Sequence, residues 1–277
     1  MTVDDQELVV AAAEAGAAVV RGRFGQLLER VDKGGGDFAT AADIEAEEAV
    51  VGLLGAARPD DFVIGEESGR SGTGKSGRTW LVDPLCGTLN FAAHTTIVSV
   101  NVALRAGPDI LAAAVADPFA GEVFWTAGGG AHVRRGGVDE PLRPVVGSRL
   151  VDVNLDPPFP NDPAFRAVEL LADREFAERY RPRVISTALA VAWTAAGRRA
   201  AYLSDGHRGY TVHSAAGISL CRAAGCVVTG LRGQPLHTGV GGLLVAADEE
   251  THADLLRLVG KQFGASPRAR PAAARGA

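Results

Sequence analysis

Apolar side chains change their spacing halfway along this sequence, and each spacing favours a different arrangement of helices and strands. Residues 8–31 and 42–54 repeat apolar side chains at helical intervals. Short β-branched and apolar runs follow, and we expect strands at 62–64, 80–82, 97–105, 110–116 and 122–126. Gly, Pro and Asp separate the last three runs, which is typical of consecutive antiparallel strands. The first half therefore predicts two helices packed on a sheet.

The second half alternates helical and extended patterns. We expect helices at 164–177, 189–196, 215–224 and 249–263, and strands at 183–185, 200–203 and 243–246. This alternation predicts a layered α/β half. We place the division near Val146, with an N-terminal α+β half at 1–145 and a C-terminal α/β half at 146–265. Residues 266–277, rich in Pro, Arg and Ala, are expected to form a flexible tail.

Composition and charge argue against several classes of protein. The 277 residues are 47% hydrophobic, enough for a substantial core in one large or two modest domains. A net charge of -5 without a basic face argues against nucleic-acid binding. No apolar run approaches the roughly 18 residues that span a membrane, and the acidic N-terminus is unlike a secretory signal. We therefore expect a cytoplasmic protein, and its three unpatterned cysteines suit a reducing compartment.

Residues 69–76 match the phosphate-loop pattern G-x-x-x-x-G-K-[ST], but their context argues against a nucleotide site. A phosphate loop needs a helix that opens at the Lys-Ser pair, so that its N-terminal amides face the phosphates. Here only residues 77–79 separate that pair from the next expected strand. We therefore interpret the segment as a mobile polar loop that joins two strands.

Carboxylates stand near the ends of expected elements in three segments, at Asp43, at Glu66 with Glu67, and at Asp83. Hard divalent cations such as magnesium bind several oxygen ligands, which clustered carboxylates supply. Each segment alone is uninformative, because Gly-Glu-Glu-Ser and Asp-Pro sequences commonly form turns. Their order along the chain carries more information than any one of them.

Taken together, five motifs in order resemble the inositol monophosphatase family. The family motif D-P-[IL]-D-G-T-x-N-F appears as DPLCGTLNF at 83–91, and W-D-x-A-A-G appears as VHSAAG at 212–217. Segments 40–43, 65–68 and 121–131 complete the resemblance, which covers nearly the whole chain. It implies a layered αβαβα sandwich, the sugar phosphatase fold, that is often a homodimer. Members hydrolyse phosphate monoesters of inositol, sugars or nucleotides with two or three magnesium ions.

The resemblance also implies roles for individual residues. Glu66, Asp83 and the Leu85 carbonyl would hold the first metal ion. Asp43 and Thr88 would orient the attacking water.

Further residues would contact the substrate. The amides around Gly87 and Thr88, at the start of a short helix, would receive an anionic oxygen. The turn at Ser186 and Thr187 and the carboxylate of Asp205 would face the rest of a small, phosphorylated substrate.

Two positions depart from the family pattern. Cys86 and His213 stand where the family has the two Asp ligands of its second metal ion. Sulfur and nitrogen serve magnesium poorly, so the second site should be lost or weakened. Since both positions touch one ion in relatives, we expect the thiol and the imidazole to lie within a few ångströms of each other.

Three interpretations of this pair remain open. In one, the site has lost its metal and the protein is a non-catalytic homologue that binds a ligand or partner. In another, phosphate hydrolysis persists with altered metal use. Zinc, held by Asp83, Cys86 and His213, could replace magnesium, or His213 could protonate the leaving group. The cofactor would then be one residual divalent ion.

The third interpretation, which we prefer from the sequence alone, is thiol chemistry. His213 would take the proton of Cys86, and the helix after Gly87 would stabilise the thiolate. Asp205 or Asp43 would orient the imidazole. Group transfer, cyclisation or isomerisation of a small metabolite in specialised biosynthesis would suit such a pair, with no metal required.

Overall fold

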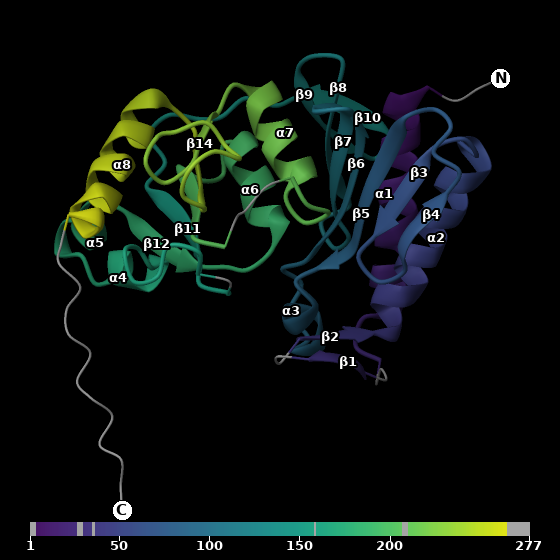
Figure 1. Ribbon diagram of the computed structural model, residues 1–277, viewed down its shortest axis with the longest axis horizontal. Helices are drawn as coiled ribbons and strands as arrows, with labels where there is room; N and C mark the ends of the chain where they lie inside the picture. Colours follow the sequence, from purple (N-terminus) through teal and green to yellow (C-terminus); the bar gives the residue numbers. More distant parts are fainter. Residues whose placement is uncertain (1–3, 27–29, 35–36, 158, 207–209, 265–277) are drawn as a thin grey trace, which may run out of the picture.

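Five alternating layers of helix and sheet make up the molecule, as Figure 1 shows. The computed structural model describes residues 4–26, 30–34, 37–157, 159–206 and 210–264. Along the long axis of the view, a helical pair covers a large sheet, a second helical pair follows, and a smaller sheet and its outer helices complete the stack. The expected αβαβα sandwich is confirmed. The expected tail at 266–277 lies outside the described residues.

The first helical layer consists of α1 (Asp5–Arg23) and α2 (Ala41–Ala57). Asp4 caps α1 by accepting a hydrogen bond from the Glu7 amide. The prediction that the first helix continues to residue 31 is wrong. The helix ends at Arg23, because Phe24 has an extended ψ of 135°, and Gly25 continues the turn with a left-handed φ of 78°. Residues 30–34 form strand β1 (Arg30–Gly34) opposite β2 (Asp37–Thr40).

The large sheet has the strand order β10-β9-β8-β7-β6-β5-β3-β4, and only β3 and β5 pair in parallel. Its strands are β3 (Phe62–Gly65), β4 (Gly69–Gly72), β5 (Arg78–Cys86), β6 (Ser99–Ala106), β7 (Asp109–Asp117), β8 (Glu122–Ala127), β9 (Ala131–Arg135) and β10 (Val138–Pro141). The expected antiparallel succession of β6, β7 and β8 is confirmed.

Residues 69–76, which match the phosphate-loop pattern, contain the second strand of a hairpin and the start of the turn that follows it. The first residues of this segment form β4, antiparallel to β3, so the expectation of a plain loop is wrong there. No helix opens at Lys75 and Ser76, because a turn leads directly into β5 at Arg78. The absence of that helix confirms that the pattern at 69–76 is not a phosphate loop.

The small sheet has the order β12-β11-β13-β15-β14, with β11 parallel to both neighbours. Its strands are β11 (Leu150–Asn154), β12 (Arg181–Val184), β13 (Ala201–Ser204), β14 (Val227–Thr229) and β15 (Leu243–Ala246). The remaining helices are α3 (Thr88–Ala92), α4 (Ala167–Leu171), α5 (Arg174–Arg179), α6 (Ala188–Ala195), α7 (Ala215–Ala224) and α8 (Glu249–Phe263). The single helix expected at 164–177 is two helices, since Asp173 caps α5 and starts a new one.

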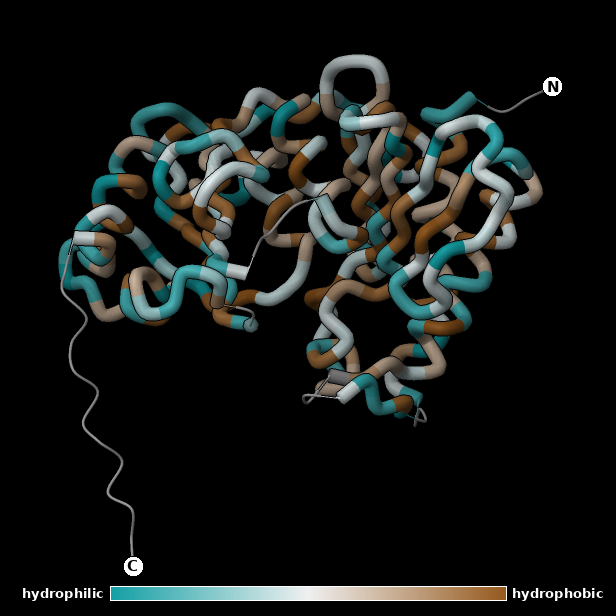
Figure 2. Tube along the Cα trace, viewed as in Figure 1, coloured by the Kyte–Doolittle hydropathy of each residue, from teal (hydrophilic) through white to brown (hydrophobic). Residues whose placement is uncertain are grey.

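Buried apolar side chains form three clusters: one under the first helical pair, one that surrounds the central helical pair and reaches both sheets, and one under the outer helices. Figure 2 shows the apolar residues gathered along the strands and the inner sides of the helices. The middle cluster joins Phe124 of the large sheet, Leu189 of α6 and Val245 of the small sheet. The two halves thus share one core across α6 and α7. Within the described residues, every helix is too short or too polar to cross a bilayer.

Candidate active site

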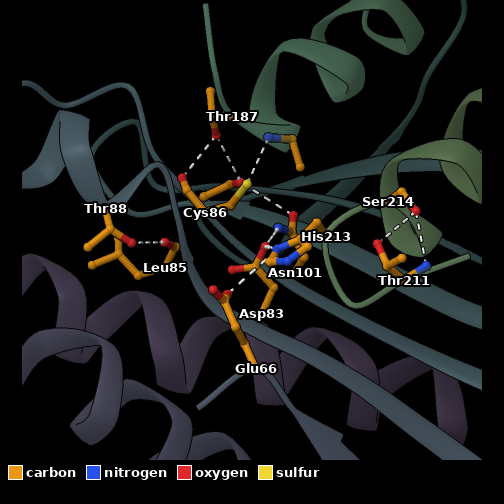
Figure 3. Close-up of polar contacts among 12 residues, drawn as sticks. Glu66, Asp83, Leu85, Cys86, Thr88, Asn101, Thr187, Thr211, His213 and Ser214 are labelled. Atoms are coloured by element: carbon orange, nitrogen blue, oxygen red, sulfur yellow. Dashed lines mark hydrogen bonds and ion pairs between the residues drawn. The ribbon is translucent and has the colours of Figure 1, made fainter. Parts of the chain in front are cut away.

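Strand ends from both halves bring the predicted site residues together. Asp83 and Cys86 end β5, and the parallel pairing of β3 with β5 places Glu66 beside them. The Glu66 amide donates to the Val82 carbonyl at 3.1 Å, which fixes the turn after β3. His213 reaches the same place from the second half, just before α7 (Figure 3).

Glu66, Asp83 and His213 form a compact cluster whose ligand atoms lie within 4.8 Å of one another. His213 Nδ1 is 2.9 Å from Asp83 Oδ2 and 3.6 Å from Glu66 Oε2. Asp83 is fully buried, and its Oδ1 has no hydrogen-bond partner among the described residues. Burying an oxygen of this kind without a partner is costly, so this position favours a cation. Two carboxylates and one imidazole fit a divalent metal ion.

The cluster perturbs the pKa of each member. Burial and the charge of Asp83 raise the pKa of Glu66 to about 8. Burial opposes the charged imidazole, but the bond to Asp83 outweighs it and raises the pKa of His213 to about 9. Burial likewise opposes ionisation of Asp83, yet the bond to His213 holds the pKa of this carboxyl below its usual range. Asp83 is therefore the anion that organises the cluster.

Lys33 adds a positive charge that the sequence reasoning missed. Its Nζ lies 3.1 Å from Glu66 Oε1 and 2.6 Å from Glu67 Oε1. Burial lowers the pKa of Lys33, but its bonds to the two glutamates outweigh this effect and raise it. Glu47, also missed, accepts bonds from the Glu67 and Ser68 amides at 2.8 and 2.6 Å. Nothing in a single sequence marked these residues, because their contacts join separate elements.

Asp43 and Thr88 meet as expected. Thr88 Oγ1 donates to Asp43 Oδ1 at 2.9 Å and also lies 3.1 Å from the Leu85 carbonyl oxygen. Thr40 holds the other oxygen of Asp43 through its amide and its hydroxyl, at 2.7 and 2.6 Å. Burial nonetheless raises the pKa of Asp43. The pair is preorganised, while its role toward water and that of Leu85 toward a metal stay predictions.

The environment of Cys86 differs from the one expected. Its sulfur accepts a hydrogen bond from the Ala188 amide at 3.1 Å, so the contacting helix start belongs to α6 and not to the helix after Gly87. Burial and the charge of Asp83 raise the pKa of the Cys86 thiol. Among the described residues, no hydrogen bond joins this thiol to His213. The thiol and the imidazole instead both lie beside Asp83, which orients the imidazole in place of Asp205 or Asp43 (Figure 3).

The expected substrate turn lies against the first half. Thr187 Oγ1 donates to the Cys86 carbonyl at 3.1 Å, and the side-chain Nδ2 of Asn90 donates to the Ser186 carbonyl at 3.1 Å. Ser186 itself hydrogen-bonds to Asp156. Gly87 has a φ of 104°, a left-handed conformation that favours glycine at the start of α3. Ser186, Thr187, Gly87 and Cys86 therefore form one continuous wall.

Asp205 lies apart from this wall. It is 1% exposed, follows β13, and accepts a hydrogen bond from Asn161. Among the described residues, its Oδ2 has no hydrogen-bond partner, and Asp205 is not part of the cluster of Glu66, Asp83 and His213. Its contact with substrate stays a prediction.

Comparison with known proteins agrees with the motif pattern. The profile of the inositol monophosphatase family matches residues 4–262. An inositol-1-monophosphatase of Caulobacter vibrioides is 31% identical over 260 residues, which cover 90% of this chain and 98% of the relative. An inositol-1-monophosphatase of Mesorhizobium japonicum is 32% identical over 265 residues, covering 93% and 96%.

Solved structures extend the likeness to three dimensions. The extragenic suppressor protein SuhB of Bartonella henselae superposes with a TM-score of 0.81 at 25% identity, over 92% of this chain and 98% of that one. An IMPase of Thermotoga maritima superposes with a TM-score of 0.78 at 20% identity, over 92% and 96%, a likeness of fold. From the match of the family profile and the curated relatives, this chain belongs to the inositol monophosphatase family.

Proposed function

We propose that the protein is a metal-dependent phosphomonoesterase that acts on an inositol, sugar or cyclitol phosphate and uses its metal differently from its relatives. The observation that carries the proposal is the Glu66–Asp83–His213 cluster around Asp83 Oδ1, which has no hydrogen-bond partner among the residues described. Family membership and the inositol-1-monophosphatases among the relatives support the substrate class.

The donor set favours an ion softer than magnesium. Magnesium prefers six oxygen ligands, whereas imidazole suits zinc, copper, iron and nickel. Glu66, Asp83 and His213 would hold the ion through two carboxylates and one nitrogen. A bound divalent cation would polarise the phosphate and lower the pKa of a water molecule. Cys86 is a weak candidate ligand, since its thiol has a raised pKa and already accepts the Ala188 amide.

The chain's own groups supply the remaining steps. The Asp43–Thr88 pair holds the attacking water, with the hydroxyl of Thr88 fixed by Asp43. The amides at the Gly87 turn bind a phosphate oxygen. Lys33 balances the negative charge of the glutamates and of the incoming phosphate. His213, half-exposed, bonds to Asp83 through Nδ1 and would leave its other ring nitrogen for the ion.

The thiol mechanism has less support. A nucleophilic cysteine needs a lowered pKa and a base within hydrogen-bond reach. The pKa of Cys86 is raised, and the His213 nitrogen that bonds nearby is engaged by Asp83. Both features favour hydrolysis with a metal over catalysis by the thiol.

A metal-dependence assay on the purified protein tests the proposal. Phosphate release from inositol and sugar phosphates is measured after EDTA treatment and after addition of magnesium, manganese or zinc. We expect EDTA to abolish turnover, and zinc to restore it better than magnesium. Asp83→Asn should lower the rate by about 100-fold or more, because it removes a ligand charge. Cys86→Ser, the matched control, should keep most activity.

Two outcomes would overturn the proposal. Turnover that survives EDTA but disappears in Cys86→Ser would favour thiol chemistry instead. No phosphate release from any substrate with any of the three metals would favour a non-catalytic binding protein.

A further inference from the structure

A line of buried polar side chains leads away from Asp83 along β6 (Figure 3). Asn101 Nδ2 lies 3.2 Å from Asp83 Oδ2, and Ser99 Oγ donates to Asn101 Oδ1 at 3.3 Å. Ser99 Oγ is in turn 3.3 Å from Thr187 Oγ1, at the start of α6. Asn101 and Ser99 are both 0% exposed. These residues connect the acidic cluster to the second half of the molecule.

The strand register places these side chains together. β5 and β6 pair so that Asp83 lies opposite Asn101 and Cys86 lies opposite Ser99. Residues two apart on a strand point to the same face, so Ser99 and Asn101 both face the site. Val98 and Val100 occupy the other face and are buried in the core of the first half. Two polar side chains buried on the same face of a strand are costly unless they are hydrogen-bonded.

The chemistry of the groups fixes the direction of the bonds. Ionised Asp83 can only accept, so the Asn101 amide must turn its NH₂ toward it and its oxygen toward the Ser99 hydroxyl. Thr187 donates to the Cys86 carbonyl and accepts from the Leu189 amide, which caps α6. Each hydroxyl has one proton, so a direct bond between Ser99 and Thr187 requires one of them to release its outer acceptor.

We infer that Asn101 is a positioning residue for the metal-binding carboxylate, secured from behind by Ser99. This inference rests on the proposed function. Asn101 and His213 both bond to the same oxygen of Asp83, Oδ2. The other oxygen, Oδ1, is left without a partner among the described residues and is the one available to a cation. Asn101 thereby fixes the rotation of the carboxylate and selects its ligand atom.

Direct measurement of metal binding tests this role. Manganese binding to the full chain is followed by electron paramagnetic resonance, without reference to turnover. We expect Asn101→Leu, similar in volume but unable to donate, to raise the Kd by about 10- to 100-fold. Ser99→Ala should raise it less and in the same direction. Because Ser99 acts through Asn101, adding Ser99→Ala to Asn101→Leu should change the Kd little further.

Val100→Ala is the matched control, since Val100 lies between the two residues on the opposite face of β6. It should lower the melting temperature and leave the manganese Kd unchanged. An unchanged Kd in Asn101→Leu, or an equal rise in Val100→Ala, would overturn the inference. If Asn101→Leu does not fold, Ser99→Ala alone decides, because an unchanged manganese Kd in that variant would contradict the positioning of Asp83 by Asn101 and Ser99.

The outcomes separate the two proposals. Manganese binding by the wild type without any phosphatase activity would contradict the proposed function but not the positioning role of Asn101. A manganese Kd that does not change in Asn101→Leu would contradict only the positioning role of Asn101. A wild-type chain that binds no divalent cation would overturn both.

Discussion

A single carboxylate, Asp83, organises the site. One of its oxygens accepts hydrogen bonds from the imidazole of His213 and the side-chain amide of Asn101, and the other has no partner within the part of the chain that the structure describes. Its charge also raises the pKa of the neighbouring Cys86 thiol, in addition to the effect of burial. The two family departures therefore have different consequences: His213 joins the candidate ligand set, whereas Cys86 is a thiol with a raised pKa that accepts a hydrogen bond from the Ala188 amide.

The identity of residue 213 should set the metal preference. In His213→Asp, a hard oxygen replaces the nitrogen, and we expect the ratio of magnesium-supported to zinc-supported phosphate release to rise roughly tenfold or more. His213→Asn, the matched control, offers a weaker neutral oxygen and should lose activity with either metal. Initial rates across metal titrations give the comparison. An unchanged ratio in His213→Asp would show that this residue does not contact the ion.

His252 should make the stability sensitive to acid. Burial lowers the pKa of this residue, whose Nε2 lies 2.7 Å from Thr229 Oγ1. Below the unfolded pKa of about 6.5, the unfolded chain binds a proton that the folded chain resists. The free energy of unfolding should therefore fall as the pH decreases below that value, toward the lower folded pKa. Urea unfolding at pH values on either side of 6.5 should show a smaller fall in His252→Gln than in wild type; an equal fall would contradict this assignment.

Four of the helices could be predicted from their apolar periodicity, whereas strands β1 and β4 could not be predicted. The helices α2, α6, α7 and α8 follow apolar periodicity, and their expected ranges agree with the structure. Strands β1 and β4 are exposed along their length and have no such pattern. They exist because a neighbouring strand offers hydrogen bonds, which is a tertiary effect.

In the candidate site, contacts within and between the short motifs could be predicted, whereas contacts that depend on the packing of distant elements could not. Its motifs predicted that Asp43 meets Thr88 and that Glu66 lies near Asp83, because short motifs and strand ends carry that information. The bond from His213 to Asp83 joins residues 130 positions apart, and the motifs indicated only that the two positions share a site, not which atoms would bond. Lys33 and Asn101 reach the cluster only through the packing of separate elements.

The cap of α8 gives a test at the scale of one helix. Asp248 accepts from the Thr251 amide at 2.8 Å and from the Thr251 hydroxyl at 2.9 Å. Asp248→Ala leaves that amide unsatisfied and should lower the free energy of unfolding by about 1 kcal/mol. Glu250→Ala, an exposed first-turn control without a cap bond, should change it by less than about 0.5 kcal/mol. Equal effects of the two variants in urea unfolding would contradict a specific cap.

At the scale of the whole molecule, the two halves depend on each other. The link at residues 142–149 joins the large sheet to the small one. The middle core, however, draws its side chains from both sheets and from the two helices between them. Both halves also contribute to the site, since Asp83 belongs to one half and His213 to the other. Neither half keeps a complete core or a complete site alone.

This shared core predicts one cooperative unfolding transition. Ile218, fully buried on α7, lies in the cluster that both sheets line. Ile218→Ala should cost about 2–5 kcal/mol, through lost burial and the cavity left behind. Native-state hydrogen exchange, read by mass spectrometry, should show the slowest amides of β6 and of β13 losing the same free energy. If β6 kept its wild-type protection while β13 lost it, the halves would be independent domains, and the contact between His213 and Asp83 would be an interface between two units that unfold separately.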